Sequence, residues 1–375
     1  MGDENLHQSP PISNVDQSAQ QTLIRYLQDL PEADKPSASN APSRKTPNSR
    51  ANDGKPRLLL MGQRRSGKSS ISSVVFHKLP PPETLYLETT TRIKKEYMHS
   101  FMDFQVWDFP GHLNYTDPSF DTEEIFGEIG ALIWVIDAQD DFFDAVTKLN
   151  ELIQYLQENY PEIIVEVFIH KVDGLSDDYL SDTYQIIVDR VQDELEDSGH
   201  PLGNVSFHRT SIYDHSIYEA FSKVIQKLIF EIGPLESLLT TLCANCKMEK
   251  AYLFDVLSKI YIASDLSPSD SSSYEISSEY VDLVVDISEI YGWDRNELEG
   301  GDTEQIEEDP EVGNQDAESL IVLEKKNGSY LYLKEINKYL ALICIMGDDS
   351  PTDRKALIDY NVGVFQETLK QIFPR

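Results

Sequence analysis

Eight residues from Gly62 to Ser69 have the spacing of a phosphate-binding loop. They read G-Q-R-R-S-G-K-S and fit the pattern G-x-x-x-x-G-K-[ST]. Glycine at both positions lets the backbone turn tightly, so that successive N–H groups point at a polyphosphate and the next helix adds its positive dipole end. In such a loop Lys68 reaches the outer phosphates and the Ser69 hydroxyl holds Mg²⁺. The nucleotide-binding residues expected here are Gly62, Arg64, Arg65, Ser66, Gly67, Lys68, Ser69 and Ser70.

Four residues further along the chain could sense the γ-phosphate and the metal. Thr90 lies in the loop after the first helix, although the threonine on either side of it is an alternative. Asp108 ends an apolar run, where its carboxylate can contact the metal. Gly111 has no Cβ, so its N–H can approach a phosphate, and His112 could orient the attacking water or be a surface histidine without a role. We expect Ser69, Thr90 and Asp108 to be metal ligands, and Thr90, Gly111 and His112 to be catalytic.

The sequence His170-Lys171-Val172-Asp173 is similar to the N-K-x-D guanine motif, with histidine in place of asparagine. The two oxygens of Asp173 can accept hydrogen bonds from guanine N1–H and the 2-amino group, a donor pair that adenine lacks. The stem of Lys171 can cover one face of the base. The segment Thr210-Ser211-Ile212, which ends the last strand, could supply a backbone N–H to guanine O6. In isolation this motif could also be a pair of charges in a loop; its position after the two phosphate motifs favours guanine.

Apolar strands and amphipathic helices alternate between residues 55 and 231, which is typical of an α/β fold with a doubly wound, mostly parallel sheet. The nucleotide is then expected at the carboxyl ends of the strands. The expected strands are Leu58–Met61, Phe101–Asp108, Gly130–Asp137, Ile163–His170 and Val205–Thr210, and the expected helices are Ser70–Lys78, Asp141–Asn159, Asp178–Ser198 and Asp214–Phe230.

Residues 235–375 differ in kind and predict a smaller α+β domain without an evident catalytic cluster. The expected order is helix, two strands, helix, three strands, helix, with a hairpin signal at Asn327-Gly328. An acidic run at 296–318 predicts a flexible loop. Residues 1–54 are rich in Ser, Pro, Asn, Asp and Gln and predict a disordered tail.

Composition excludes several classes of protein. A formal net charge of −33 over 375 residues argues against nucleic-acid binding and against unaided adsorption to anionic membranes. The three cysteines are too few for a disulfide framework, and Cys243-x-x-Cys246 predicts packing along a helix rather than a metal or redox site. No apolar run approaches the roughly 18 residues of a membrane span, and neither end fits a lipidation motif. Any membrane attachment is therefore expected through a partner.

Taken together, the motifs resemble the Rag GTPases. G-Q-R-R-S-G-K-S-S, Q-V-W-D-F-P-G, F-I-H-K-V-D-G-L-S-D-D and E-K-A-Y-L-F-D-V-L-S-K-I-Y-I-A are similar to the C/D-type subunit and its fungal counterpart, from about residue 55 to the end. The resemblance implies a Ras-like GTPase domain that uses GTP, GDP and Mg²⁺, followed by a roadblock-type domain that pairs with an A/B-type Rag subunit. It also implies a lysosomal or vacuolar scaffold, signalling of amino-acid sufficiency to the target-of-rapamycin kinase complex, and a folliculin-type activator of slow hydrolysis.

Two features depart from the family pattern. His112 stands where most members have glutamine, which leaves hydrolysis possible and its rate open. Arg64 and Arg65 inside the loop would crowd a trans arginine finger, so we expect an activator to approach from another angle. The alternatives are an interaction subunit stabilised by its nucleotide with negligible hydrolysis, an Arf-like trafficking GTPase, and a nucleotide kinase, which would not need Asp173.

Overall fold

The computed structural model describes twelve segments of the chain: residues 57–98, 104–111, 122–127, 129–203, 205–229, 232–256, 258–268, 271–290, 318–322, 330–337, 339–347 and 355–372. All of them belong to one compact unit, Gly54–Arg375. The expected disordered tail, the catalytic candidate His112, the Asn327-Gly328 turn and residues 296–317 of the acidic run lie outside the described residues.

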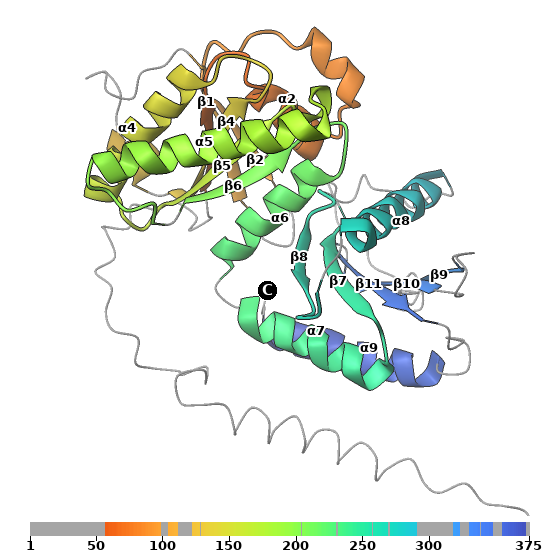
Figure 1. Cartoon of the computed structure of the whole chain (residues 1–375). Coiled ribbons are helices and arrows are strands. Elements are labelled where there is room, and N and C mark those ends of the chain that lie inside the picture. The colour runs from red at the N-terminus through yellow and green to blue at the C-terminus, as the bar shows by residue number, and fades with distance from the viewer. Residues whose placement is uncertain are drawn as a thin grey trace, which may run out of the picture. The chain divides into compact units, whose positions relative to one another are not determined.

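The first half of the chain forms a six-stranded sheet in the order β2-β3-β1-β4-β5-β6 (Figure 1). Neighbouring strands from β3 to β6 are parallel, and β2 is antiparallel to β3 at the edge. Strand β1, in the middle of the sheet, is fully buried from Leu58 to Leu60. A continuous apolar run of this kind is typical of a parallel strand in a sheet that is covered on both faces. The strands are β1 (Arg57–Gly62), β2 (Lys94–Met98), β3 (Phe104–Asp108), β4 (Ile129–Asp137), β5 (Ile164–His170) and β6 (Val205–Thr210).

Helices cover both faces of this sheet, because successive residues of β1 point to opposite sides. Leu58 and Leu60 pack in a cluster with α2 (Lys68–His77) and α6 (Ser216–Leu228). Leu59 and Met61 pack in a second cluster with α3 (Thr122–Phe126), α4 (Phe143–Asn159) and α5 (Asp177–Asp197). The mixed, mostly parallel sheet with helices on both faces fits a Ras-like P-loop fold.

Four elements of this half were not predicted: η1 (Pro81–Tyr86), α3, β2 and the short turn η2 (Val172–Gly174). The strand β2 reads K-K-E-Y-M, and its exposed Lys94, Lys95 and Tyr97 give it no apolar run. An edge strand can remain this polar because only one of its sides pairs with the sheet. Its hydrogen bonds to β3 define it, and these could not be read from its own residues.

The second half forms a five-stranded antiparallel sheet in the order β8-β7-β11-β10-β9. Its strands are β7 (Lys250–Asp255), β8 (Tyr261–Ser264), β9 (Glu318–Val322), β10 (Tyr330–Glu335) and β11 (Leu340–Met346). Helices α7 (Ile232–Cys246) and α9 (Lys355–Ile372) lie on one side of the sheet and α8 (Ser271–Ile290) on the other (Figure 1). The predicted order of helix, two strands, helix, three strands and helix is confirmed.

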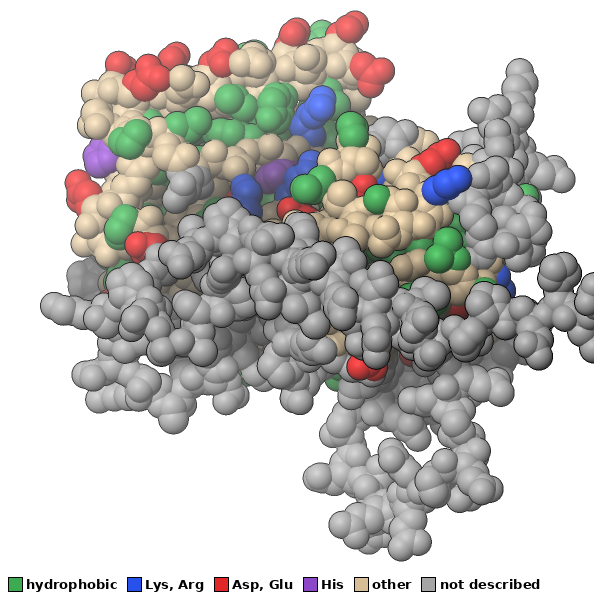
Figure 2. Space-filling model, turned by 90° about the horizontal axis from the view of Figure 1, so that it is seen from below, with side chains coloured by type: hydrophobic (Ala, Val, Ile, Leu, Met, Phe, Trp, Pro, Cys, Tyr) green, Lys and Arg blue, Asp and Glu red, His purple; other side chains and the backbone are tan. Residues whose placement is uncertain are grey.

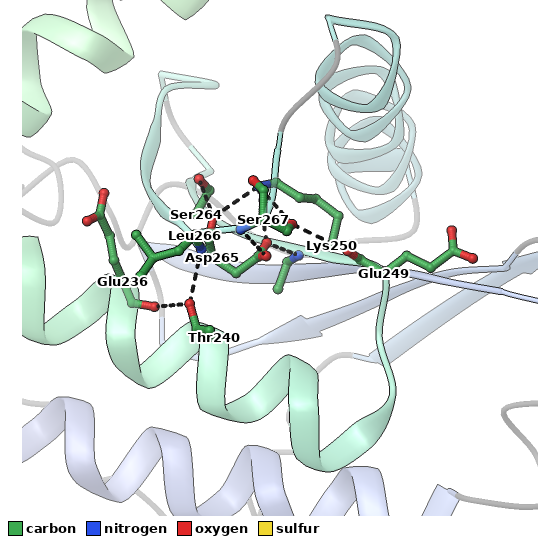
Figure 3. A network of polar contacts seen from close by, with 9 residues as sticks. Glu236, Thr240, Glu249, Lys250, Ser264, Asp265, Leu266 and Ser267 are labelled. Carbon is green, nitrogen blue, oxygen red and sulfur yellow. Dashed lines mark hydrogen bonds and ion pairs between the residues drawn. The ribbon is translucent and has the colours of Figure 1, made fainter.

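A buried ion pair fixes the end of the β7–β8 hairpin (Figure 3). Lys250 and Asp265 are each 4% exposed, and Lys250 Nζ lies 3.2 Å from Asp265 Oδ1. Lys250 Nζ also donates to the backbone oxygens of Asp265 and Ser267, while Ala251 N donates to Asp265 Oδ1. Leu266 N donates to Thr240 Oγ1 on α7, which ties the hairpin to that helix.

The two sheets share one continuous apolar cluster, in which α6 takes part. Tyr261 of β8 is held on α6 by two hydrogen bonds: Tyr261 N donates to Ser222 Oγ at 3.1 Å, and Gln226 Nε2 donates to Tyr261 O at 3.3 Å. The cysteines of α7, Cys243 and Cys246, are buried in the same cluster, and burial raises the pKa of the Cys243 thiol to about 12. Their predicted packing role is confirmed.

The surface reflects the composition of the chain. Acidic side chains follow the upper rim of the face shown in Figure 2, in keeping with the net charge of −33. Across the described segments, no helix has both the length and the apolar character that a membrane span requires.

Candidate functional site

The loop between β1 and α2 can turn only because of two glycines. Gly62 has φ 139°, and a Cβ there would lie 2.3 Å from Val135 O on β4. Gly67 has φ 105°, and a Cβ there would lie 2.6 Å from His170 Cδ2. Both values lie in the region that favours glycine, so the pattern seen in the sequence is required by the backbone. Between them Arg64 and Arg65 are exposed and Ser66 is buried.

The ammonium group of Lys68 folds back into this loop. Its Nζ donates to Gly62 O at 3.0 Å, to Gln63 O at 2.7 Å and to Ser66 Oγ at 3.3 Å. Burial lowers the pKa of Lys68 from 10.5 to about 8, and the nearby carboxylate of Asp108 acts in the opposite direction. A partly desolvated ammonium held among neutral acceptors has a strong electrostatic preference for an anion.

The three expected metal ligands meet beside this lysine. Ser69 Oγ lies 2.6 Å from Thr90 Oγ1 and donates to Asp108 Oδ2 at 2.6 Å, and Thr90 Oγ1 lies 3.3 Å from the same carboxylate oxygen. The contacts single out Thr90 from its neighbours Thr89 and Thr91, which are exposed. These contacts favour Thr90 within the triple threonine, and its role toward the metal and the γ-phosphate stays a prediction.

Asp108 has features expected of a cation ligand. Asp108 is 2% exposed, and its buried Oδ1 atom has no hydrogen-bond partner among the described residues. Burial raises the pKa of this carboxyl, although Ser69, Lys68 and Thr90 act the other way. Two hydroxyls and a carboxylate with an unused oxygen form the hard oxygen donor set that Mg²⁺ prefers. The residues present fit this ion.

Gly111 lies directly against the phosphate loop. A Cβ at this position would be 2.3 Å from Arg64 N, so only glycine allows the approach of the two backbones. This contact was not predicted, and the approach of the Gly111 N–H to a phosphate stays a prediction. His112, the next residue, lies outside the described part of the chain, so its catalytic role stays a prediction.

His170 ends β5 on the opposite side of the loop. The residue is 1% exposed, its Nδ1 lies 3.0 Å from Thr210 Oγ1, and its ring packs against Gly67. Burial lowers the pKa of His170 to about 4, and the positive charge of Lys171 adds to this effect. The imidazole is therefore neutral at physiological pH, and it joins the base motif to the phosphate loop.

The remaining base-motif residues form a connected network. Lys171 Nζ donates to Arg65 O at 2.8 Å and pairs with Asp137 Oδ2 at 2.5 Å. Ser211 Oγ donates to Asp173 Oδ1 at 2.6 Å, which holds the carboxylate predicted to read guanine. Ser211 N donates to Ser216 Oγ, so among the backbone donors considered for guanine O6, that of Ser211 is already engaged.

A cavity of about 390 Å³ joins the phosphate loop and the base motif. This volume lies within the ordinary range of small-ligand pockets. The predicted residues that line it are Arg64, Arg65, Gly67, Lys68, Ser69, Ser70, Thr90, Gly111, His170, Lys171, Asp173 and Ile212, whereas Gly62, Ser66, Asp108 and Ser211 do not. Sequence reasoning missed seven further lining residues, for which local spacing carries no signal: Thr84, Leu85, Leu87, Glu88, Phe109, Gln139 and Tyr213.

Comparison with known proteins agrees with this geometry. The family model described as "Gtr1/RagA G protein conserved region" matches residues 57–281. GTP-binding protein gtr2 of Schizosaccharomyces pombe is 50% identical over 320 residues, which cover 85% of this chain and 98% of that protein. Human Ras-related GTP-binding protein C is 49% identical over 325 residues, covering 86% of this chain and 78% of that protein.

A more distant relative represents another branch of the same group. GTP-binding protein GTR1 of Saccharomyces cerevisiae is 26% identical over 184 residues, covering 48% of this chain and 59% of that protein. The identity to gtr2 of Schizosaccharomyces pombe and to human Ras-related GTP-binding protein C is much higher and extends over most of their length. This chain is therefore grouped with these two proteins rather than with GTR1. The chain belongs to the Rag family of Ras-related GTPases, in the branch that contains the C/D-type subunits and fungal gtr2.

Proposed function

We propose that this protein is a guanine-nucleotide switch that hydrolyses GTP slowly with Mg²⁺ and acts as the C/D-type subunit of a Rag heterodimer. The observation that carries the nucleotide part is the convergence of Ser69, Thr90 and Asp108 within hydrogen-bond distance, beside the buried ammonium of Lys68. Relatives with the printed names "GTP-binding protein" and "Ras-related GTP-binding protein" support it.

The residues of the phosphate side divide the work between them. Ser69, Thr90 and Asp108 would hold Mg²⁺, which offsets the charge on the phosphate oxygens when it is bound. Lys68 donates to the outer phosphates, and exchanging its neutral acceptors for an anion restores favourable solvation of the ammonium. The N–H of Gly111 would approach the γ-phosphate, and His112 would orient the attacking water.

On the base side Asp173 selects guanine. Ser211 Oγ donates a hydrogen bond to Asp173 Oδ1 at 2.6 Å and thereby orients the carboxylate toward the cavity. The aliphatic stem of Lys171 flanks the base. A base without the N1–H and 2-amino donor pair leaves this carboxylate with only the hydrogen bond from Ser211, which costs binding energy. Ile212 N supplies the donor to guanine O6.

A sharp test of the nucleotide proposal uses Lys68→Met in the full chain. Nucleotide that co-purifies with the wild type should be GDP or GTP, identified by chromatography of the released ligand. Loss of the charge-assisted bonds of Lys68 should weaken GDP binding by on the order of 100-fold. Equal GDP affinity in Lys68→Met would refute the assignment of this loop.

Hydrolysis is tested separately by single-turnover release of phosphate from the partnered protein. We expect intrinsic turnover on the order of 10⁻⁴ to 10⁻² s⁻¹, with stimulation by a folliculin-type activator. His112→Ala should lower the stimulated rate. Release that no activator stimulates would favour the alternative of an interaction subunit that binds its nucleotide without using hydrolysis.

The partner proposal assigns the five-stranded half to a roadblock-type domain that pairs with an A/B-type Rag subunit. Supporting this, α8 packs one side on the sheet through Tyr274, Val281 and Val285 and leaves Leu283 and Ile287 exposed one turn apart. The partner subunit would be a protein similar to GTP-binding protein GTR1 of Saccharomyces cerevisiae, which is a distant relative of this chain. The heterodimer would sit on a vacuolar or lysosomal scaffold through its partners and signal amino-acid sufficiency to the target-of-rapamycin kinase complex.

Co-expression with an A/B-type subunit tests the pairing. Leu283→Lys and Ile287→Lys together should abolish co-purification, because both charges would be buried in the interface. Leu357→Lys, at a similarly exposed leucine on α9, is the matched control and should leave co-purification intact. Retained pairing in the α8 variant would exclude this face.

A further inference from the structure

Gln139 lies beside the base motif, although it belongs to none of the sequence motifs that predict the nucleotide site. It follows β4 by two residues, and the parallel register of β4 and β5 pairs Asp137 with His170. The ladder continues beyond the strands, since Ala138 N donates to His170 O at 2.9 Å. The register therefore places the side chain of Gln139 next to Lys171 and the turn that follows it.

Two contacts place the amide of Gln139 across this turn. Its Nε2 donates to Lys171 O at 2.6 Å. On the other side of Asp173, the amide packs on the backbone of Gly174, where an added Cβ would lie 2.3 Å from Nε2 and 2.6 Å from Cδ. The residues Val172–Gly174 form a short 3₁₀ turn, and Gln139 thus contacts the residues at both ends of the segment that carries Asp173.

Asp137 binds both Gln139 and Lys171. Its Oδ1 accepts from Gln139 N at 2.9 Å, and its Oδ2 pairs with the ammonium of Lys171. Lys171 itself has φ 62°, a left-handed conformation that is strained for a residue with a side chain. Such a conformation persists only where its surroundings hold it, and here the carbonyl of the strained residue is the acceptor for Gln139.

We infer that Gln139 is a positioning residue for guanine recognition: Asp137 fixes its backbone, and its side-chain amide holds the left-handed Lys171 and the turn of Asp173 in the orientation that reads the base. The inference rests on the proposed function. Gln139 is exposed and lines the cavity, so its role does not depend on a contribution to the core. Asp173 touches the base, and Gln139 acts through it.

The test measures GDP and IDP binding to the full chain and to Gln139→Ala. Loss of one neutral hydrogen bond should weaken GDP binding about five-fold. IDP lacks the 2-amino group and depends less on the orientation of Asp173, so its affinity should fall less and the preference for GDP over IDP should shrink. The thermal midpoint of the nucleotide-free chain should fall by no more than a few degrees, as expected for the loss of one exposed hydrogen bond.

Two further variants separate positioning from general support. Asp173→Asn replaces one of the two acceptor oxygens that Gln139 positions with an NH₂ donor, so the paired bonds to guanine cannot form and adding Gln139→Ala should have little further effect on GDP binding. Gln157→Ala is the matched control, because Gln157 Nε2 also donates to a backbone carbonyl, that of Pro201, away from the nucleotide cavity. It should leave the GDP-to-IDP ratio as in the wild type.

The outcomes are distinct. A wild type without preference for GDP over ADP overturns the proposed function and this inference with it. A wild type that prefers GDP, with the same GDP-to-IDP ratio in Gln139→Ala, overturns the inference alone. Additive losses in the double variant with Asp173→Asn also overturn it, because Gln139 would then act independently of that carboxylate.

Discussion

The buried histidine of the base motif should make this protein sensitive to acid. His170 is 1% exposed, and one ring edge packs on Gly67 while Nδ1 faces Thr210 Oγ1. Burial lowers its pKa from 6.5 to about 4 in the folded protein. The unfolded chain, with a pKa near 6.5, therefore binds more protons between these two values. Stability is fully present above pH 6.5 and is lost as the pH falls toward 4.

The size of the effect follows from the two pKa values. A separation of about 2.5 units corresponds to about 3.4 kcal/mol over the whole window. Between pH 7 and pH 5 the difference in protons bound by His170 amounts to about 2 kcal/mol of unfolding free energy. The loss should level off below pH 4, where the histidine is charged in both states.

The measurement is urea unfolding of the nucleotide-free full chain at pH 7, 6 and 5, beside His170→Asn. Asparagine does not titrate and is the residue that the usual N-K-x-D motif carries at this position. The other histidines and the carboxylates titrate in both proteins and cancel in the comparison. His170→Asn should therefore lose about 2 kcal/mol less than the wild type over this range. Equal losses in the two proteins would refute the argument that His170 is buried in its neutral form.

Three other substitutions test separate parts of the structure. Asp173→Asn should shift preference from guanine to xanthine nucleotides by on the order of 100-fold, since xanthine has a carbonyl where guanine has its 2-amino donor; competition binding with an unchanged preference would exclude the base assignment. Gly67→Ala places a methyl group 2.6 Å from His170 Cδ2 at φ 105°, and it should cost about 1–3 kcal/mol in thermal unfolding and weaken GDP binding; a variant with wild-type GDP affinity would contradict the tight packing. Asp265→Asn leaves the buried Lys250 without its countercharge and should destabilise the chain by about 3–5 kcal/mol in urea unfolding, and a change below 1 kcal/mol would show that the pair is not desolvated.

Much of the nucleotide site could be predicted because its chemistry depends on short sequence spacing. The positions of Gly62, Gly67 and Lys68 are set by one tight turn between a strand and a helix. The spacing of these residues in the sequence is therefore enough to predict the shape of the loop. The ends of the parallel strands bring Asp108 and His170 to the same edge of the sheet, as the alternation of strands and helices predicted.

What could not be predicted depends on contacts between distant segments. Three successive threonines are equivalent in sequence, and only the contacts of Thr90 with Ser69 and Asp108 distinguish it. Gln139 has no motif, and it becomes relevant through the register of two strands. The polar strand β2 is recognisable only from its pairing with β3.

The shared role of α6 has a consequence for experiments on parts of this protein. One turn of the helix, around Ser222 and Gln226, binds the hairpin of the second sheet, while Phe221 and Val224 lie in the cluster that covers the first. A fragment ending near residue 231 would expose apolar area to water along this helix and would be expected to aggregate or to gain a non-native dimer contact. Heat should melt the two halves in a single calorimetric transition, and nucleotide constants measured on a truncated chain would describe a different molecule.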